Sequence, residues 1–135
     1  MRLAIVASRF NGDIVDKMVE RALSRAKESG AEIAEVVRVP GTFEIPLAVQ
    51  RALERSDVDG AIALGALIEG ETDHDKLIAN AAAAALLDVA LRSGKPVGLG
   101  ITGPGMTRRQ ALARIDSAAR AVDAAVSMHR LRHSP

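Results

Sequence analysis

The sequence predicts an α/β fold, specifically a three-layer αβα sandwich built around a four-stranded parallel sheet. Two observations support this prediction. Four short apolar runs, each long enough for a buried strand, alternate with stretches in which apolar residues recur every three to four positions. Gly or Pro residues separate most of these segments. Strands that alternate with amphipathic helices run parallel, because each crossover helix returns the chain to the end of the sheet where the previous strand began. These helices cover the two faces of the sheet.

The first strand is predicted at residues 3–7, which form an apolar run without helical periodicity. Asn11-Gly12-Asp13 interrupts this run and offers side chains that can cap a helix. A helix is expected next, because apolar residues recur at helical spacing in Ile14, Met18, Ala22 and Ala26. Gly30 then lies where the end of a helix favours glycine.

The second strand is predicted at residues 33–39, and Pro40-Gly41 ends it. Pro46 suits the first turn of a helix that runs to about Arg55. The third strand, at residues 61–67, is apolar throughout, so we expect both of its faces to be buried. Thr72 and Asp73 can each act as the N-cap of the next helix, which carries residues 79–91.

The fourth strand is predicted at residues 97–101 and ends before the turn Gly103-Pro104-Gly105. Thr107 and Gln110 have the spacing of a capping box, in which each side chain binds the backbone N–H of the other residue. The last helix is expected to place its apolar residues on one face: Leu112, Ile115, Ala119, Val122 and Val126. Together these elements predict a single flavodoxin-like domain over residues 1–135.

The composition favours a compact enzyme or binding protein. A chain of 135 residues with 48% hydrophobic residues can bury a sizeable core in one domain. A net charge of +1 gives no electrostatic reason to expect nucleic acid or an anionic membrane as a partner. Neither a membrane-spanning apolar run nor a signal-peptide pattern is present, so we expect a cytoplasmic protein. The absence of cysteine excludes disulfides and thiolate chemistry.

The residues expected to carry the chemistry gather beyond the carboxyl ends of the strands, where parallel α/β sheets bind ligands. The chain's only two aromatic residues, Phe10 and Phe43, lie there, as does His74, its one histidine outside the C-terminal region. Phe43 alone could equally be a core residue. Phe10 lies between Arg9 and a polar residue at a strand end, where an apolar ring would cover a flat ligand such as a heterocycle.

Two interpretations of His74 remain open from the residues alone. It could be a solvated residue at a helix start, or an acid/base group that titrates near neutral pH. The backbone amides of Glu71 and Thr72 would offer an anion site at the same helix N-terminus. The consecutive residues Asp73, His74 and Asp75 cannot converge on one ion from a helix, so no metal is expected. No dinucleotide fingerprint, P-loop or nucleophile elbow is present.

Three segments match the motifs of a known family in order and spacing. They are Ser8-Arg9-Phe10-Asn11, Val39-Pro40-Gly41-Thr42-Phe43-Glu44-Ile45-Pro46 and the stretch at residues 65–74. On these segments the sequence resembles the lumazine synthase family over nearly its whole length, and residues 100–108 are similar to its archaeal branch. The resemblance implies a transferase of riboflavin biosynthesis, without metal or organic cofactor. Such an enzyme condenses 5-amino-6-ribitylamino-pyrimidinedione with 3,4-dihydroxy-2-butanone 4-phosphate to 6,7-dimethyl-8-ribityllumazine and releases phosphate.

The resemblance also implies roles for individual residues. Those that would hold the pyrimidine ring and the ribityl chain are Phe10, Asn11, Thr42, Phe43, Glu44, Ala66, Leu67 and Ile68. Glu71 and Thr72 would bind the phosphate group, and His74 would transfer protons. Leu99 and Arg114 would come from a neighbouring subunit, with Arg114 paired to the phosphate. From composition alone, Arg114 could be an ordinary surface arginine.

The family resemblance further implies a homo-oligomer, a pentamer that can assemble into a shell of sixty subunits. The alanine-rich segment at residues 79–87 fits this, because small side chains allow helices to approach closely. Two other functions stay open. An archaeal-type riboflavin synthase has the same fold, and a non-catalytic flavin-binding or shell-forming protein could keep the pocket without the chemistry.

Overall fold

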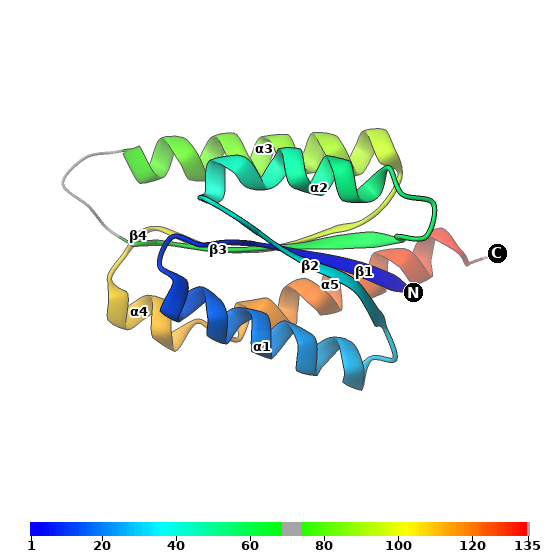
Figure 1. Cartoon of the computed structure of the whole chain (residues 1–135), viewed down its shortest axis with the longest axis horizontal. Coiled ribbons are helices and arrows are strands. Elements are labelled where there is room, and N and C mark those ends of the chain that lie inside the picture. Colours follow the sequence, from blue (N-terminus) through cyan, green and yellow to red (C-terminus); the bar gives the residue numbers. More distant parts are fainter. Residues whose placement is uncertain (69–73, 135) are drawn as a thin grey trace.

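A computed structural model describes residues 1–68 and 74–134 of the chain. Its sheet contains four strands in the order β2-β1-β3-β4, and every neighbouring pair is parallel (Figure 1). The strands are β1 (Arg2–Ser8), β2 (Glu32–Val39), β3 (Gly60–Ile68) and β4 (Val97–Met106). The predicted α/β class and parallel sheet are confirmed.

Helices cover both faces of the sheet, which gives the three predicted layers (Figure 1). One layer contains α1 (Gly12–Glu28), α4 (Arg108–Ala113) and α5 (Ser117–Arg132). The other contains α2 (Ile45–Leu53) and α3 (His74–Ser93), and a 3₁₀ turn, η1 (Thr42–Glu44), leads into α2. Within the described residues, no helix is long and apolar enough to cross a membrane.

Two hydrophobic clusters, one on each side of the sheet, stabilise this arrangement. Alternate residues of β1 point to opposite sides: Ile5 packs with Met18 of α1, whereas Val6 packs with Val49 of α2. Both faces of β1 and β3 are therefore buried, which explains why these strands are continuous apolar runs. Each fully buried aliphatic side chain of this kind contributes about 2 kcal/mol to folding.

The predicted last helix is wrong in one respect, because it is two helices. The capping box of Thr107 and Gln110 is present and begins α4. This helix ends at Ala113, and α5 begins only at Ser117, so Arg114 lies at the end of α4 and not within one continuous last helix. Because of this break, the apolar residues of α4 and α5 do not share one continuous helical face. Leu112, predicted to face inward, is 38% exposed.

The predicted end of the fourth strand is also wrong. β4 continues past residue 101 to Met106, and its register against β3 shifts between Ala66 and Ile68, where the Gly103-Pro104-Gly105 segment is accommodated. The glycine of β4 that matters most for packing is Gly98. A Cβ atom there would overlap the backbone carbonyl of Ala121, so glycine allows α5 to lie directly on the strand.

Candidate active site

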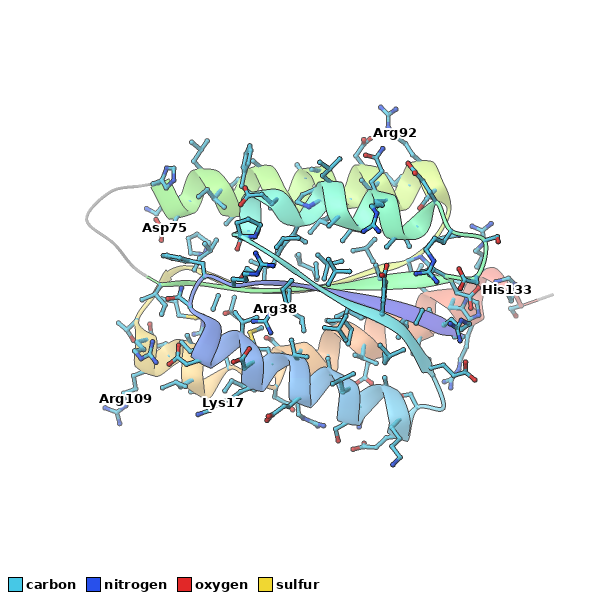
Figure 2. The ribbon with its side chains drawn as sticks, viewed as in Figure 1. Lys17, Arg38, Asp75, Arg92, Arg109 and His133 are labelled. Carbon is cyan, nitrogen blue, oxygen red and sulfur yellow. The ribbon has the colours of Figure 1, made fainter. Side chains whose placement is uncertain are left out.

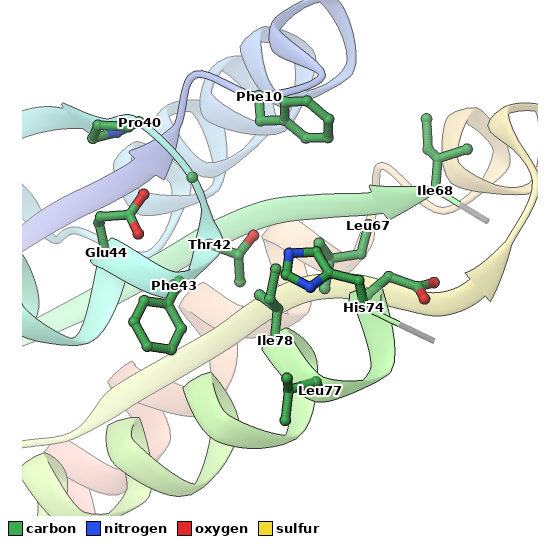
Figure 3. Close-up of a pocket in the computed structure, with 12 residues that line it drawn as sticks. Phe10, Pro40, Thr42, Phe43, Glu44, Leu67, Ile68, His74, Leu77 and Ile78 are labelled. Atoms are coloured by element: carbon green, nitrogen blue, oxygen red, sulfur yellow. The ribbon is translucent and has the colours of Figure 1, made fainter. Parts of the chain in front are cut away.

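A pocket of about 680 Å³ opens beyond the carboxyl ends of β1, β2 and β3 (Figure 3). Three of the four segments that the sequence singled out meet there, although they are far apart in the chain. The pocket is lined by Phe10, Pro40, Gly41, Thr42, Phe43, Glu44, Leu67, Ile68, His74, Asp75, Leu77 and Ile78. The sheet topology therefore brings the expected aromatic, acidic and imidazole side chains to one place.

Both aromatic rings border the pocket and do not belong to the core. Phe10 is 66% exposed and Phe43 is 64% exposed, which excludes the interpretation of Phe43 as a buried core residue. Large apolar rings held at a pocket edge offer flat faces on which a heterocycle can stack. The pocket thus suits a planar organic ligand.

The loop after β1 is attached to the loop after β2 through backbone hydrogen bonds. Arg9 N donates to Val39 O at 2.7 Å, and Phe10 N donates to Pro40 O at 3.3 Å. The hydroxyl of Ser8, which is fully buried, donates to Phe10 O at 3.3 Å. These contacts place the backbone of Phe10 at the pocket edge.

Asn11, expected beside the pyrimidine ring, does not line the pocket of the single chain. It has the left-handed backbone conformation, with φ of 55°, and its Nδ2 donates to Ala66 O at 2.7 Å. The sequence predicts that the Asn11-Gly12-Asp13 segment caps a helix. Asn11 is the N-cap residue of α1, but its side chain makes no capping hydrogen bond.

The segment after β2 forms one wall of the pocket. Thr42 is buried, and its Oγ1 would lie 2.9 Å from a Cβ atom at position 65, so Gly65 of β3 leaves the space that Thr42 occupies. Glu44 is exposed and bends back toward Gly41. The wall therefore presents a carboxylate beside the Phe43 ring (Figure 3).

The end of β3 forms the floor. Leu67 and Ile68 line the pocket, whereas Ala66 is almost fully buried and does not. The facing wall comes from the first turn of α3, where His74 is the first helical residue and is exposed. Asp75 Oδ2 accepts a hydrogen bond from Gly105 N at 3.4 Å, which connects this turn to the end of β4.

Three lining residues of α3 were not predicted as site residues: Asp75, Leu77 and Ile78. A signal for two of them was present in the sequence. Residues three and four positions after a helical residue share its face, so Leu77 and Ile78 follow from placing His74 on a helix that borders the site. In the sequence, Asp75 suggests only a metal ligand, a role that consecutive positions on a helix exclude. Among the described residues, no three His, Cys, Asp or Glu side chains are grouped as metal ligands would be.

Besides Asn11 and Ala66, four predicted site residues lie elsewhere or cannot be placed. Glu71 and Thr72 lie outside the described residues, as do the predicted N-caps Thr72 and Asp73. Leu99 of β4 is 52% exposed and lines a second, smaller hollow of about 300 Å³ between β4 and α3. Arg114 is exposed on the opposite helical layer and does not line the pocket. A neighbour's contribution from Leu99 and Arg114 stays a prediction.

A parallel sheet covered by helices, with an aromatic pocket that holds a histidine and carboxylates beyond its strand ends, is typical of an α/β enzyme whose site suits a planar ligand. The family follows from comparison with known proteins. The chain belongs to the 6,7-dimethyl-8-ribityllumazine synthase family, whose model matches residues 1–133. The resemblance seen in the sequence motifs is confirmed.

Archaeal relatives are similar over nearly their whole length. The 6,7-dimethyl-8-ribityllumazine synthase of Methanopyrus kandleri is 52% identical over 130 residues, which cover 96% of this chain and 92% of the relative. The protein of the same name from Staphylothermus marinus is 54% identical and covers 94% of this chain and 85% of its own. The one from Archaeoglobus fulgidus is 49% identical, and the match covers 95% of this chain and 90% of the relative.

Proposed function

We propose that this chain catalyses the lumazine synthase reaction of riboflavin biosynthesis. It would condense 5-amino-6-ribitylamino-pyrimidinedione with 3,4-dihydroxy-2-butanone 4-phosphate and form 6,7-dimethyl-8-ribityllumazine, phosphate and two molecules of water. Membership of the family and identities of 49–54% to proteins of that name support this. The structural observation that carries it is the pocket in which Phe10, Phe43, Glu44 and His74 meet.

The pocket suits the pyrimidine substrate. The ring would stack on Phe10, and the ribityl chain would lie along Thr42, Phe43 and Glu44. The Glu44 carboxylate can accept hydrogen bonds from the hydroxyl groups of the ribityl chain. The floor made by Leu67 and Ile68 would contact the ring from the other side. Holding the two substrates together in this way replaces a bimolecular encounter and can lower the barrier by several kcal/mol.

His74 would move the protons. An amine of the first substrate attacks the ketone of the second, and loss of water gives an imine. The imine then loses phosphate, and a second amine closes the ring with loss of another water. Each step transfers protons at near-neutral pH, which imidazole can both accept and donate. His74 lies at the pocket edge, on the helix that also borders the ring site.

The phosphate group would bind outside the part of the pocket that one chain completes. Glu71 and Thr72 are proposed to bind it through backbone amides, and Arg114 of a neighbouring subunit would pair with it. This needs a homo-oligomer, a pentamer or a sixty-subunit shell. Exposed apolar side chains support an oligomer, because such patches often mark protein–protein interfaces. Four large apolar side chains on α3 and β4 are more than half exposed in the single chain: Leu77, Leu87, Leu91 and Leu99. A cytoplasmic location stays a prediction.

The direct test is to mix the purified protein with both substrates and follow the absorbance of lumazine. Formation of lumazine and of one phosphate per turnover supports the proposal. Riboflavin formed from lumazine alone would instead identify a riboflavin synthase. Binding of flavin without any product from the two substrates would identify a non-catalytic binding or shell protein.

A further inference from the structure

Asn11 combines two features that are each unusual. Among the described residues it is the one non-glycine residue with a positive φ. Side chains with a Cβ atom are disfavoured in this conformation, although asparagine tolerates it better than most. Its side chain also makes no N-cap hydrogen bond to α1, even though asparagine is among the best residues for that bond.

The side chain of Asn11 is used for a different contact. Its Nδ2 donates to the carbonyl of Ala66, a residue 55 positions away at the end of β3, at a distance of 2.7 Å. Its own backbone carbonyl accepts from the amides of Ile14 and Val15 and so begins α1. One residue therefore connects the loop after β1, the first helix and the third strand.

The residue that makes this connection directly follows Phe10, whose ring borders the pocket. The ring is mostly exposed, so the packing of neighbouring side chains does not fix it. Both hydrogen bonds of the Phe10 backbone are long, at 3.3 Å. The shortest contacts on either side of it are Arg9 N to Val39 O and Asn11 Nδ2 to Ala66 O, both 2.7 Å. Ala66 directly precedes Leu67 and Ile68, which line the pocket across from the ring (Figure 3).

We propose that Asn11 is a positioning residue that holds the Phe10 ring at a fixed separation from the Leu67–Ile68 floor. Its left-handed backbone conformation turns the chain between β1 and α1. The hydrogen bond from its side-chain amide to Ala66 O attaches this loop to β3, the strand that carries the floor. The width of the slot for a flat ring then depends on Asn11 although Asn11 does not line it. This inference rests on the proposed function only for the identity of the ring.

The test is a double-mutant cycle with Asn11→Asp and Phe10→Ala. Aspartate keeps the size of the side chain and tolerates the left-handed conformation, but its carboxylate cannot donate to Ala66 O. We expect Asn11→Asp to raise KM for the pyrimidine substrate by roughly 3- to 10-fold, the value of one hydrogen bond, with kcat and KM for the phosphate substrate nearly unchanged. In the Phe10→Ala background the same change should raise this KM less than about 2-fold, because coupled residues are not additive.

The controls separate positioning from other effects. Asn11→Gly fits the left-handed backbone without strain and also lacks the donor, so it should show the same rise in KM and covers the case in which the aspartate variant misfolds. Gln50→Glu makes the same amide-to-carboxylate change at an exposed site on α2 and should leave KM unchanged.

Three outcomes would overturn the proposal. An unchanged KM in both Asn11 variants would show that the bond positions nothing. An equal rise with and without the Phe10 ring would show that Asn11 contacts the substrate directly. Equal loss of kcat and of affinity for both substrates would show a general structural defect. If the wild type makes no lumazine, the proposed function fails, and the same cycle is then run on the dissociation constant of riboflavin.

Discussion

Phe10, Phe43 and His74 share a property that their residue types alone do not predict: all three are exposed beside one pocket. Large apolar rings are usually buried, and their exposure here leaves two flat surfaces available to a ligand. His74 lines the same pocket, so we expect a substrate held against the rings to lie near an imidazole. The proposed chemistry would draw on all three residues, which line the same pocket.

His74 should be needed for turnover but not for folding. We expect His74→Ala to lower kcat by roughly 10²- to 10⁴-fold, the usual contribution of an acid/base group. The chain should keep its thermal unfolding midpoint, because the side chain is exposed. Steady-state kinetics and a melting curve measure the two quantities.

His133→Ala provides the matched control. His133 lies at the opposite end of the molecule from Asp75, the neighbour of His74 (Figure 2). This variant should retain full activity. Wild-type turnover in His74→Ala would remove the histidine from the mechanism.

The elements that frame the site are connected at their ends. α4 begins with the capping box of Thr107 directly after β4, and the Gly105 amide of the same segment contacts Asp75 of α3. α5 begins after a break and is held against α1 by Arg21–Asp116 and Arg25–Asp123 ion pairs, both with a contact under 3 Å. The contacts of Thr107 and Gly105 thus connect the end of β4 to the helices on both faces of the sheet.

Loss of the capping box should destabilise the chain measurably. Thr107→Ala removes the acceptor for the Gln110 amide, and such changes typically cost about 1 kcal/mol. Urea unfolding should show a lower midpoint with an unchanged slope. Ser127→Ala, a surface change within α5, is the control and should have little effect. A Thr107→Ala midpoint equal to that of the wild type would contradict the role of the cap.

The ion pair at the start of α5 should make stability depend on pH. The hydrogen bond from Arg21 lowers the pKa of Asp116 in the folded chain. Because the carboxylate has a lower pKa in the folded chain than in the unfolded chain, its ionisation stabilises the fold at any pH above the unfolded pKa, near 3.9. This contribution disappears as the pH falls through the folded pKa.

Asp116→Asn should therefore reduce the free energy of unfolding slightly at pH 7, and this difference should shrink at an acidic pH below the unfolded pKa, near 3.9. The effect should be small, because the pair is exposed. Urea unfolding of both proteins at the two pH values measures it. A difference that is the same at both pH values would contradict the assignment.

At the scale of the whole molecule, the sequence predicted how strands and helices alternate along the chain. The strands of a parallel sheet are apolar runs, and the helices between them are amphipathic, so both patterns are strong. It also predicted that Phe10, Glu44 and His74 would meet, since strand ends converge in such a sheet. It did not predict the break near Arg114, because the apolar spacing continues through it. The contact of Asn11 with Ala66 was missed as well, since nothing local distinguishes it from a helix cap.

The exposed leucines of α3 predict how the molecule assembles. Leu87 is 62% exposed, so Leu87→Glu should leave the folded chain intact but prevent association by placing a charge in an apolar contact. Multi-angle light scattering should show a smaller particle than the wild type. Leu131→Glu, at a leucine of α5 that is 65% exposed, is the matched control and should assemble normally. A wild-type protein that is a stable monomer would contradict the shared site.

The central claim, that the pocket beyond β1, β2 and β3 holds the pyrimidine, is tested most directly by a crystal structure of the protein with 6,7-dimethyl-8-ribityllumazine. We predict that the ring system stacks on Phe10, that the ribityl chain runs past Glu44, and that His74 lies within hydrogen-bonding reach of the ring system. Product bound at any other place, with this pocket filled only by solvent, would contradict the claim.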